Sequence, residues 1–272
     1  DYIETGSLIT VKSKLAGIRI PSEEHRINMH PMDFEEWLWA NGDEITSDML
    51  RSFMERREPL GDSTHKVVLR KYIEYMIIGG MPQVVSAYLE HHDIMEAEYI
   101  KKDILDLYRD DIHKIPGVSM ERALNLFNCI PAILSSPHKV LSPTKIEKGT
   151  RKRDYDRAAE WLCDAKLFNR CRCSSDPGTA IGLTKDTNRV KCYLLDTGLL
   201  ISLAFQNDTD GLTETYGLLM DGKLSINKGM LFENCVAQEL VCRGYDLWFT
   251  EFEKKGTERK YEVDFILPSR SG

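Results

Sequence analysis

The sequence lacks a long apolar segment. The longest candidate, from Leu199 to Phe205, is interrupted by Ser202. A helix that crosses a bilayer needs about 20 apolar residues, and the N-terminal residues do not have the pattern of a signal peptide. The sequence therefore predicts a folded, soluble protein of the cytoplasm with no membrane partner.

The sequence also lacks an excess of positive charge. Its 36 lysines and arginines face 43 aspartates and glutamates, which gives a net charge of −7. This balance excludes a protein that coats nucleic acid with a wholly basic surface, so any such contact needs a local patch. The 272 residues, 42% of them hydrophobic, can build one large domain or two to three small ones at about 150 residues each.

Cysteine pairs of the kind that bind zinc are absent. The seven cysteines are odd in number and scattered, which favours reduced, buried thiols over a disulfide framework. Zinc sites usually contain two cysteines separated by two to four residues. Only one residue separates Cys171 from Cys173, and no histidine lies nearby. We expect no zinc, and its binding by these two cysteines with Cys163 and Cys192 is the weaker alternative.

The first half of the chain has the pattern of successive helices. Asp33 is placed to cap a helix that starts near it. The apolar residues of 65–78 recur at helical spacing, and Gly79 follows as a stop signal. Pro82 can restart a helix, and 94–111 repeats the apolar spacing. Residues 33 to 115 should therefore be almost wholly helical.

The next segment has the order of a winged helix-turn-helix. Amphipathic helices are predicted over 120–134 and 151–165, with a short helix starting at Ser142-Pro143-Thr144 between them. Strands are predicted over 167–173 and 190–195. In this module the third helix commonly enters the major groove of DNA.

The predicted third helix and its approach carry a local excess of basic residues. Six cations stand against three carboxylates, which leaves a local charge of +3. Contacts to phosphate are one interpretation. A solvated helix face or a protein docking surface is the other, because interleaved carboxylates repel phosphate. The candidate nucleic-acid-binding residues are Lys145, Lys148, Arg151, Lys152, Arg153 and Arg157, interleaved with Glu147, Asp154 and Asp156.

The last segment carries acidic residues that could bind a metal. A helix over 228–243 and a hairpin of strands over 247–252 and 260–267 form an α/β pattern. Glu262 and Asp264 project from the same face of the last strand, about 6.6 Å apart. With Glu233 on the preceding helix, they offer carboxylate oxygens to Mg²⁺, which could activate water for phosphodiester hydrolysis. The alternative is a solvated helix or hairpin face.

Several motifs together resemble one family. Residues 229–240 (GMLFENCVAQEL) and 262–266 (EVDFI) are similar to the PD-(D/E)xK nuclease-like domain at the C-terminus of a group of prokaryotic AAA-type ATPases. The resemblance covers essentially the whole chain. Its other landmarks are 4–8 (ETGSL), like the sensor 1 strand, 31–36 (PMDFEE), like the segment after the ATPase core, 79–82 (GGMP), like the helical lid, 108–111 (YRDD) and 193–200 (YLLDTGLL).

The resemblance implies a mostly helical α+β protein. It would contain AAA lid-type helices, a winged helix-turn-helix and an α/β restriction-endonuclease-like domain. The implied domains are a remnant of the ATPase core at 1–32, a lid-like domain at 33–117, a winged-helix-like domain at 118–190 and a truncated nuclease-like domain at 191–272.

The resemblance also implies ligands and roles. ATP with Mg²⁺ would bind the parent protein, with Thr5, Gly6 and Ser7 near the γ-phosphate. The alternative for this trio is an ordinary turn. Glu233, Glu262 and Asp264 would be catalytic, with Asp264 and Glu233 as ligands of a nuclease-site Mg²⁺. DNA and a second copy of the chain are the partners that the resemblance allows.

The chain departs from the family in two places. No G-x-x-x-x-G-K-[ST] loop occurs, nor the acidic magnesium strand, so we expect no ATP hydrolysis by this chain alone. The (D/E)-x-K strand after Asp264 is also missing, and Val263 stands in place of the usual proline. Lys260 is a poor replacement for the missing lysine, since it lies about 13 Å along the same strand. Both chain ends read as cut.

Three functional hypotheses follow. The chain is the C-terminal part of an AAA-type ATPase that couples nucleotide state to a nucleic-acid or protein partner, a metal-dependent DNA nuclease, or a non-catalytic scaffold that binds DNA or protein. We favour the first for the parent protein and the third for these residues alone.

Overall fold

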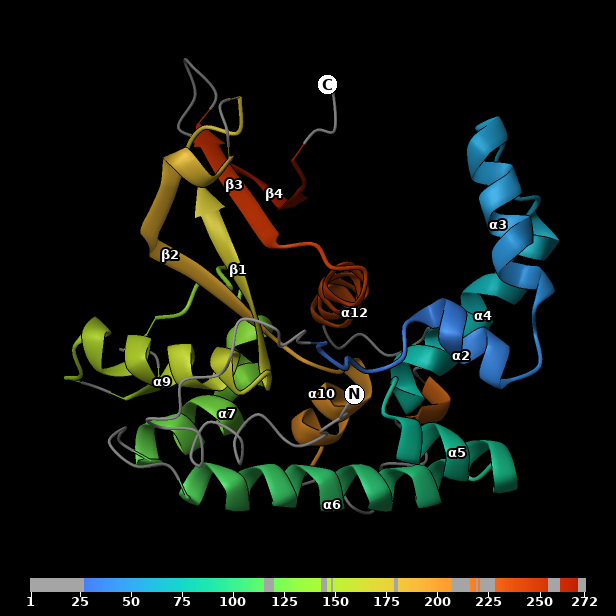
Figure 1. Ribbon diagram of the computed structural model, residues 1–272, viewed down its shortest axis with the longest axis horizontal. Helices are drawn as coiled ribbons and strands as arrows, with labels where there is room; N and C mark the ends of the chain where they lie inside the picture. The colour runs from blue at the N-terminus through green and yellow to red at the C-terminus, as the bar shows by residue number, and fades with distance from the viewer. Residues whose placement is uncertain are drawn as a thin grey trace, which may run out of the picture.

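The computed structural model describes residues 27–114, 120–142, 146–147, 149–178, 181–206, 216–218, 220, 228–253 and 260–268. Within these ranges the chain folds into nine α-helices, one short 3-10 helix and a four-stranded mixed sheet. The predicted mostly helical α+β class is therefore confirmed. Figure 1 shows helices at the base and on one side of the molecule, with the sheet rising from the other side and α12 between them.

The predicted N-terminal helices are confirmed. The Asp33 side chain accepts a hydrogen bond from the Glu36 amide at 2.9 Å, and the Glu36 carboxylate accepts one from the Asp33 amide at 3.0 Å. This reciprocal cap satisfies two amides that the first helical turn leaves free. The helices are α2 (Phe34–Ala40), α3 (Ile45–Arg56), α4 (Asp62–Ile78), α5 (Pro82–His91) and α6 (Ile94–His113).

The remaining helices include the two that flank the predicted winged-helix turn. The predictions over 120–134, 151–165 and 228–243 are confirmed within one or two residues. The predicted short helix start at 142–144 lies mostly outside the described residues. These helices are α7 (Met120–Leu134), α9 (Lys152–Asp164), α10 (Thr197–Ala204) and α12 (Lys228–Cys242).

The sheet joins the two predicted hairpins. The strands are β1 (Phe168–Ser174), β2 (Lys185–Leu194), β3 (Leu247–Glu253) and β4 (Lys260–Ile266), with the 3-10 helix Ile181–Thr184 between β1 and β2. Their order is β2-β1-β3-β4. Both hairpins are antiparallel, and a parallel pairing of β1 with β3 connects them. One sheet thus contains strands from the predicted winged-helix-like and nuclease-like segments.

Two helices cover opposite faces of this sheet. Cys192 of β2 contacts Cys163 of α9, whereas Tyr193, the next residue, contacts Glu233 of α12. Successive side chains of a strand point to opposite faces. α9 therefore lies on one face and α12 on the other.

A buried carboxylate joins α4, α10 and the loop before α5. Asp196 is fully buried and accepts hydrogen bonds from the Gly80 amide at 2.6 Å and from the Leu199 amide at 2.8 Å. Gly79 has a φ of 87°, and a Cβ at this position would lie 2.4 Å from Asp196 Oδ1. The glycine and aspartate motifs, far apart in the sequence, therefore meet in the core because only glycine leaves room for the carboxylate.

Candidate functional site

The predicted acidic residues of β4 contact a lysine of another strand. The Lys191 ammonium group pairs with the Glu262 carboxylate and lies 3.2 Å from Asp264 Oδ1. The lysine side chain is 0% exposed, whereas those of Glu262 and Asp264 are 30% and 46% exposed. We call these three residues the lysine–carboxylate cluster.

Lys191 reaches this cluster across the face of the sheet. It belongs to β2 and its partners to β4, which are the two edge strands. Three strand spacings separate these edges, or about 14 Å in a flat sheet. The Lys191 Nζ lies 4.8 Å from the ring centroid of Phe249 on β3, so an aromatic ring supports the cation between the two edges.

In this cluster, burial and the attraction between opposite charges shift the pKa values in opposite directions. Burial lowers the pKa of Lys191, but the hydrogen bond to Glu262 and the charges of both carboxylates outweigh it, so the pKa lies above its ordinary value. Burial raises the pKa of Glu262, and the neighbouring Asp264 adds to this effect in spite of the lysine. The cluster thus holds two carboxylates around one cation, with like-charge repulsion between the carboxylates.

The third predicted acid, Glu233, has partners of its own. Its carboxylate pairs with Lys139, and the Tyr193 hydroxyl donates a hydrogen bond to Glu233 Oε2 at 3.3 Å. Burial raises the pKa of Tyr193 well above its usual value, so this hydroxyl remains a donor at neutral pH. The segment after Lys139 forms an isolated bridge from Val140 to Lys191, which places this pair beside β2.

The carboxylates as arranged do not fit a divalent ion. Each of the three already contacts a lysine ammonium group. Within the part of the chain that the structure describes, no group of three or more histidine, cysteine, aspartate or glutamate side chains could hold a metal ion. Metal binding by Asp264 and Glu233 stays a prediction. In the present arrangement these carboxylates do not form a set of metal ligands.

Lys191 is the site residue that sequence reasoning missed. We considered only Lys260 as a lysine near Asp264, and its side chain lies outside what the structure describes. The available signal was a single cation within the apolar end of a strand, Val190 to Leu195. Because lysine is rarely buried without a partner, such a position predicts a buried carboxylate nearby, although the sequence does not say which one.

The predicted DNA-binding residues are only partly described. Arg151, Arg153 and Arg157 are exposed, and the latter two lie one helical turn apart on α9. The other three candidates, Lys145, Lys148 and the side chain of Lys152, lie outside the described parts.

Two of the interleaved carboxylates turn toward other partners. Asp154 lies 3.7 Å from an amino group of Arg122 on α7. Glu147 lies 4.0 Å from the same arginine and accepts a hydrogen bond from the Tyr155 hydroxyl at 3.2 Å. Arg122 therefore offsets part of the negative charge that would oppose phosphate at α9.

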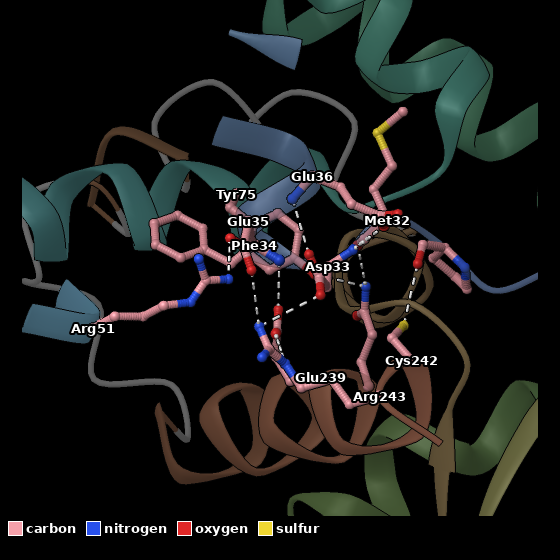
Figure 2. Close-up of polar contacts among 12 residues, drawn as sticks. Met32, Asp33, Phe34, Glu35, Glu36, Arg51, Tyr75, Glu239, Cys242 and Arg243 are labelled. Atoms are coloured by element: carbon pink, nitrogen blue, oxygen red, sulfur yellow. Dashed lines mark hydrogen bonds and ion pairs between the residues drawn. The ribbon is translucent and has the colours of Figure 1, made fainter. Parts of the chain in front are cut away.

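The segment that leads into α2 is held against α12. Figure 2 shows Glu239 of α12 and Arg243, the residue directly after this helix, projecting toward Asp33, Phe34 and Glu35. The Phe34 amide donates to Glu239 Oε1 at 2.7 Å, and an Arg243 amino group lies 3.5 Å from Asp33 and 3.7 Å from Glu35. Burial raises the pKa of Glu239, although the Phe34 amide opposes this shift. We call these five residues the entry clamp.

The predicted ATP-contacting residues Thr5, Gly6 and Ser7 lie outside the described residues, which begin at residue 27. No helix among the described parts of the chain is long and apolar enough to cross a bilayer.

Comparison with known proteins gives one family. A family model described as a domain of unknown function (DUF8612) matches residues 69–210, which is just over half of the chain. The match begins within α4, extends past the end of α10 and includes α9 and the β1–β2 hairpin. Comparisons with curated proteins and with solved structures gave no match.

Proposed function

The chain belongs to the family of the domain of unknown function DUF8612, and we propose that it is the C-terminal portion of a cytoplasmic AAA-type ATPase. In this proposal ATP and Mg²⁺ bind a region outside these 272 residues. Lid-type helices, a winged helix and a nuclease-like domain then couple nucleotide state to DNA.

The observation that carries the proposal is the entry clamp. Residues 31–36 resemble the segment that follows the ATPase core, and the clamp fixes this segment to α12 through the Phe34 amide and Arg243. Two further side chains of α12 hold the end of β2 and the start of α10. Asn234 accepts a hydrogen bond from the Leu194 amide at 2.8 Å, and Gln238 accepts one from the Thr197 amide at 2.9 Å. A displacement of the entering segment would therefore move α12 and the sheet together.

The sheet connects this helix to the candidate DNA-binding face. α9 leads into β1 through a tight turn, in which the Leu167 amide donates to the Leu162 carbonyl at 2.9 Å. Arg153 and Arg157 project from the exposed side of α9. Cations at this position suit the phosphate backbone, which supplies most of the salt-dependent affinity of such contacts.

Charge reversal on α9 tests the DNA contact. We expect Arg153→Glu/Arg157→Glu to weaken binding of a fluorescent DNA duplex at least tenfold in anisotropy titrations and to lower the salt slope by about 2. Lys66→Glu/Arg70→Glu is the matched control, because these residues are an exposed i, i+4 pair on α4. Equal losses in both variants, or none in either, would refute the α9 contact.

The coupling is tested in the intact protein that carries a P-loop. We expect that protein to bind ATP with Mg²⁺ and DNA to change its hydrolysis rate. Glu239→Ala should reduce this DNA response while leaving ATP affinity unchanged, since it removes the acceptor of the Phe34 amide in the clamp. An intact protein that does not bind ATP would overturn the proposal.

A metal-dependent nuclease is the second candidate. Two carboxylates beside Lys191 match the residue types of a nuclease centre. Their neutralisation by this lysine favours instead a scaffold without catalysis. Incubation of supercoiled plasmid with the chain and Mg²⁺ or Mn²⁺ separates the two. Cleavage that disappears in Asp264→Ala would establish the nuclease, and an inert wild-type chain would leave the scaffold.

A further inference from the structure

Two cysteines and an arginine meet on the face of the sheet that α9 covers. Arg170 of β1 and Cys192 of β2 are direct partners across the antiparallel pair, so their side chains project to the same face. Cys163 lies in the last turn of α9, directly before the turn into β1. Cys163 and Arg170 line one surface pocket, so both cysteines lie beside the same arginine, and Cys192 and Arg170 each shift the pKa of Cys163. The three side chains form the Cys163–Arg170–Cys192 group.

Cys163 is accessible from solvent through a surface pocket. The pocket lies between the end of α9, β1 and the turn from α12 into β3. Cys163 is partly exposed, whereas Cys192 is buried behind it. A small solute can therefore reach the first sulfur but not the second. The charged lining residues are the cations Lys166, Arg170 and Arg172 and the carboxylates Asp164 and Asp246.

We propose that Cys163 and Cys192 are a peroxide-responsive thiol pair, in which Cys163 reacts with a hydroperoxide and Cys192 resolves the product to a disulfide. The inference is independent of the proposed function. It rests on the adjacency of the two sulfurs, the guanidinium group beside one of them and the pocket that reaches it.

The electrostatics assign the two roles. The hydrogen bond from Cys192 lowers the pKa of Cys163, and Arg170 lowers it further against the effect of burial. The same hydrogen bond and burial raise the pKa of Cys192 well above its usual value. Thiolate is the reactive form of cysteine, so Cys163 is the attacking sulfur and Cys192 keeps its proton.

The reaction proceeds in two balanced steps. The Cys163 thiolate attacks one oxygen of the hydroperoxide. An S–O bond forms, the O–O bond breaks and the alkoxide leaves with a proton from water, which gives a sulfenic acid. The Cys192 thiol then attacks the sulfenic sulfur and passes its proton to the departing oxygen, so that an S–S bond forms, the S–O bond breaks and the oxygen leaves as water. Two thiols are thereby oxidised by two electrons and the hydroperoxide is reduced to alcohol and water.

Peptide mass spectrometry of the reduced full chain tests the pair. We expect hydrogen peroxide to produce a Cys163–Cys192 cross-linked peptide while Cys129 and Cys242 remain open to alkylation. These two cysteines are also partly exposed and are the internal controls. A Cys192→Ser variant should accumulate sulfenic acid at Cys163, trapped with dimedone.

Two arginine variants separate the local charge from the pocket. We expect Arg170→Met to slow alkylation of Cys163 about tenfold at neutral pH, the effect of one pKa unit on a thiolate population. Arg172→Met is the matched control, since Arg172 lines the same pocket but its guanidinium lies over Trp248 at 5.8 Å. The proposal fails if Cys129 or Cys242 reacts as fast as Cys163, if oxidised Cys163 never links to Cys192, or if both arginine variants behave alike.

Discussion

The Lys191 ammonium group lies 3.2 Å from a carboxylate oxygen of Asp264, although their strands form opposite edges of the sheet. The Lys191 side chain crosses β1 and β3 to make this contact, which no local sequence pattern encodes. It also places a cation where the nuclease-like resemblance would place a metal ion. Stability measurements on the cluster therefore bear directly on what this face of the sheet does.

Removal of the bridging lysine should destabilise the fold. We expect Lys191→Met to lower the free energy of unfolding by about 2 kcal/mol in urea titrations at pH 7, because two carboxylates are left without their cation. The loss stays below that of a fully buried pair because Glu262 and Asp264 are partly exposed. Lys66→Met, on the exposed face of α4, should change stability by less than about 0.5 kcal/mol. Equal effects of the two variants would contradict the bridge.

The loss of stability in Lys191→Met should depend on pH. Burial and Asp264 already raise the pKa of Glu262, and loss of the lysine should raise it further. A carboxyl with a raised folded-state pKa favours the folded state as pH falls through that pKa, because the folded protein then binds the proton more tightly. The deficit of Lys191→Met relative to wild type should therefore shrink between pH 7 and pH 5. A constant deficit over this range would refute the explanation.

The glycine beside Asp196 should be intolerant of a side chain. Gly42 and Gly79 both have positive φ, 74° and 87°, but only the Gly79 position places a Cβ against another group, Asp196 Oδ1 at 2.4 Å. We expect Gly42→Ala to cost about 1 kcal/mol through backbone strain. Gly79→Ala should cost at least about 3 kcal/mol, since it adds a clash with a buried carboxylate. Chemical denaturation measures both, and similar values would show that the carboxylate moves aside freely.

The ion pair of Lys101 with Glu98, unlike the lysine–carboxylate cluster, is fully buried and should show strong coupling. Lys101 and Glu98 are both buried on α6, with Lys101 Nζ 3.0 Å from Glu98 Oε2. Lys101→Met leaves a buried carboxylate without its cation, and we expect a loss of about 3–5 kcal/mol. Glu98→Gln in addition should restore about 1–3 kcal/mol of it, because the unpaired charge is removed. A double variant no more stable than Lys101→Met alone would show that the pair is not coupled.

The effect of the entry clamp should be measurable as hydrogen exchange of the Phe34 amide. We expect Glu239→Ala to accelerate hydrogen exchange of the Phe34 amide and to cost about 1–2 kcal/mol, because the acceptor of that amide is lost. Arg243→Ala should cost less than about 1 kcal/mol, since its side chain is half-exposed. Unchanged exchange at Phe34 in Glu239→Ala would show that this hydrogen bond does not hold the segment.

Local patterns sufficed for the helices and for the pairing of neighbouring strands. The cap at Asp33, the stop at Gly79 and the restart at Pro82 all occur where the sequence predicts them, because each depends on residues within one or two turns. The proximity of Glu262 and Asp264 was likewise readable from their spacing on one strand.

Tertiary structure decided everything that joins distant segments. The parallel pairing of β1 with β3, the choice of Lys191 as the partner of Glu262 and Asp264, the separation of Glu233 from that cluster and the meeting of Cys163 with Cys192 all involve residues at least 29 positions apart. Composition and spacing determine which segments form helices and strands and which side chains need partners. Which partners they obtain depends on how the helices and strands pack, because burial brings together side chains that no local periodicity relates.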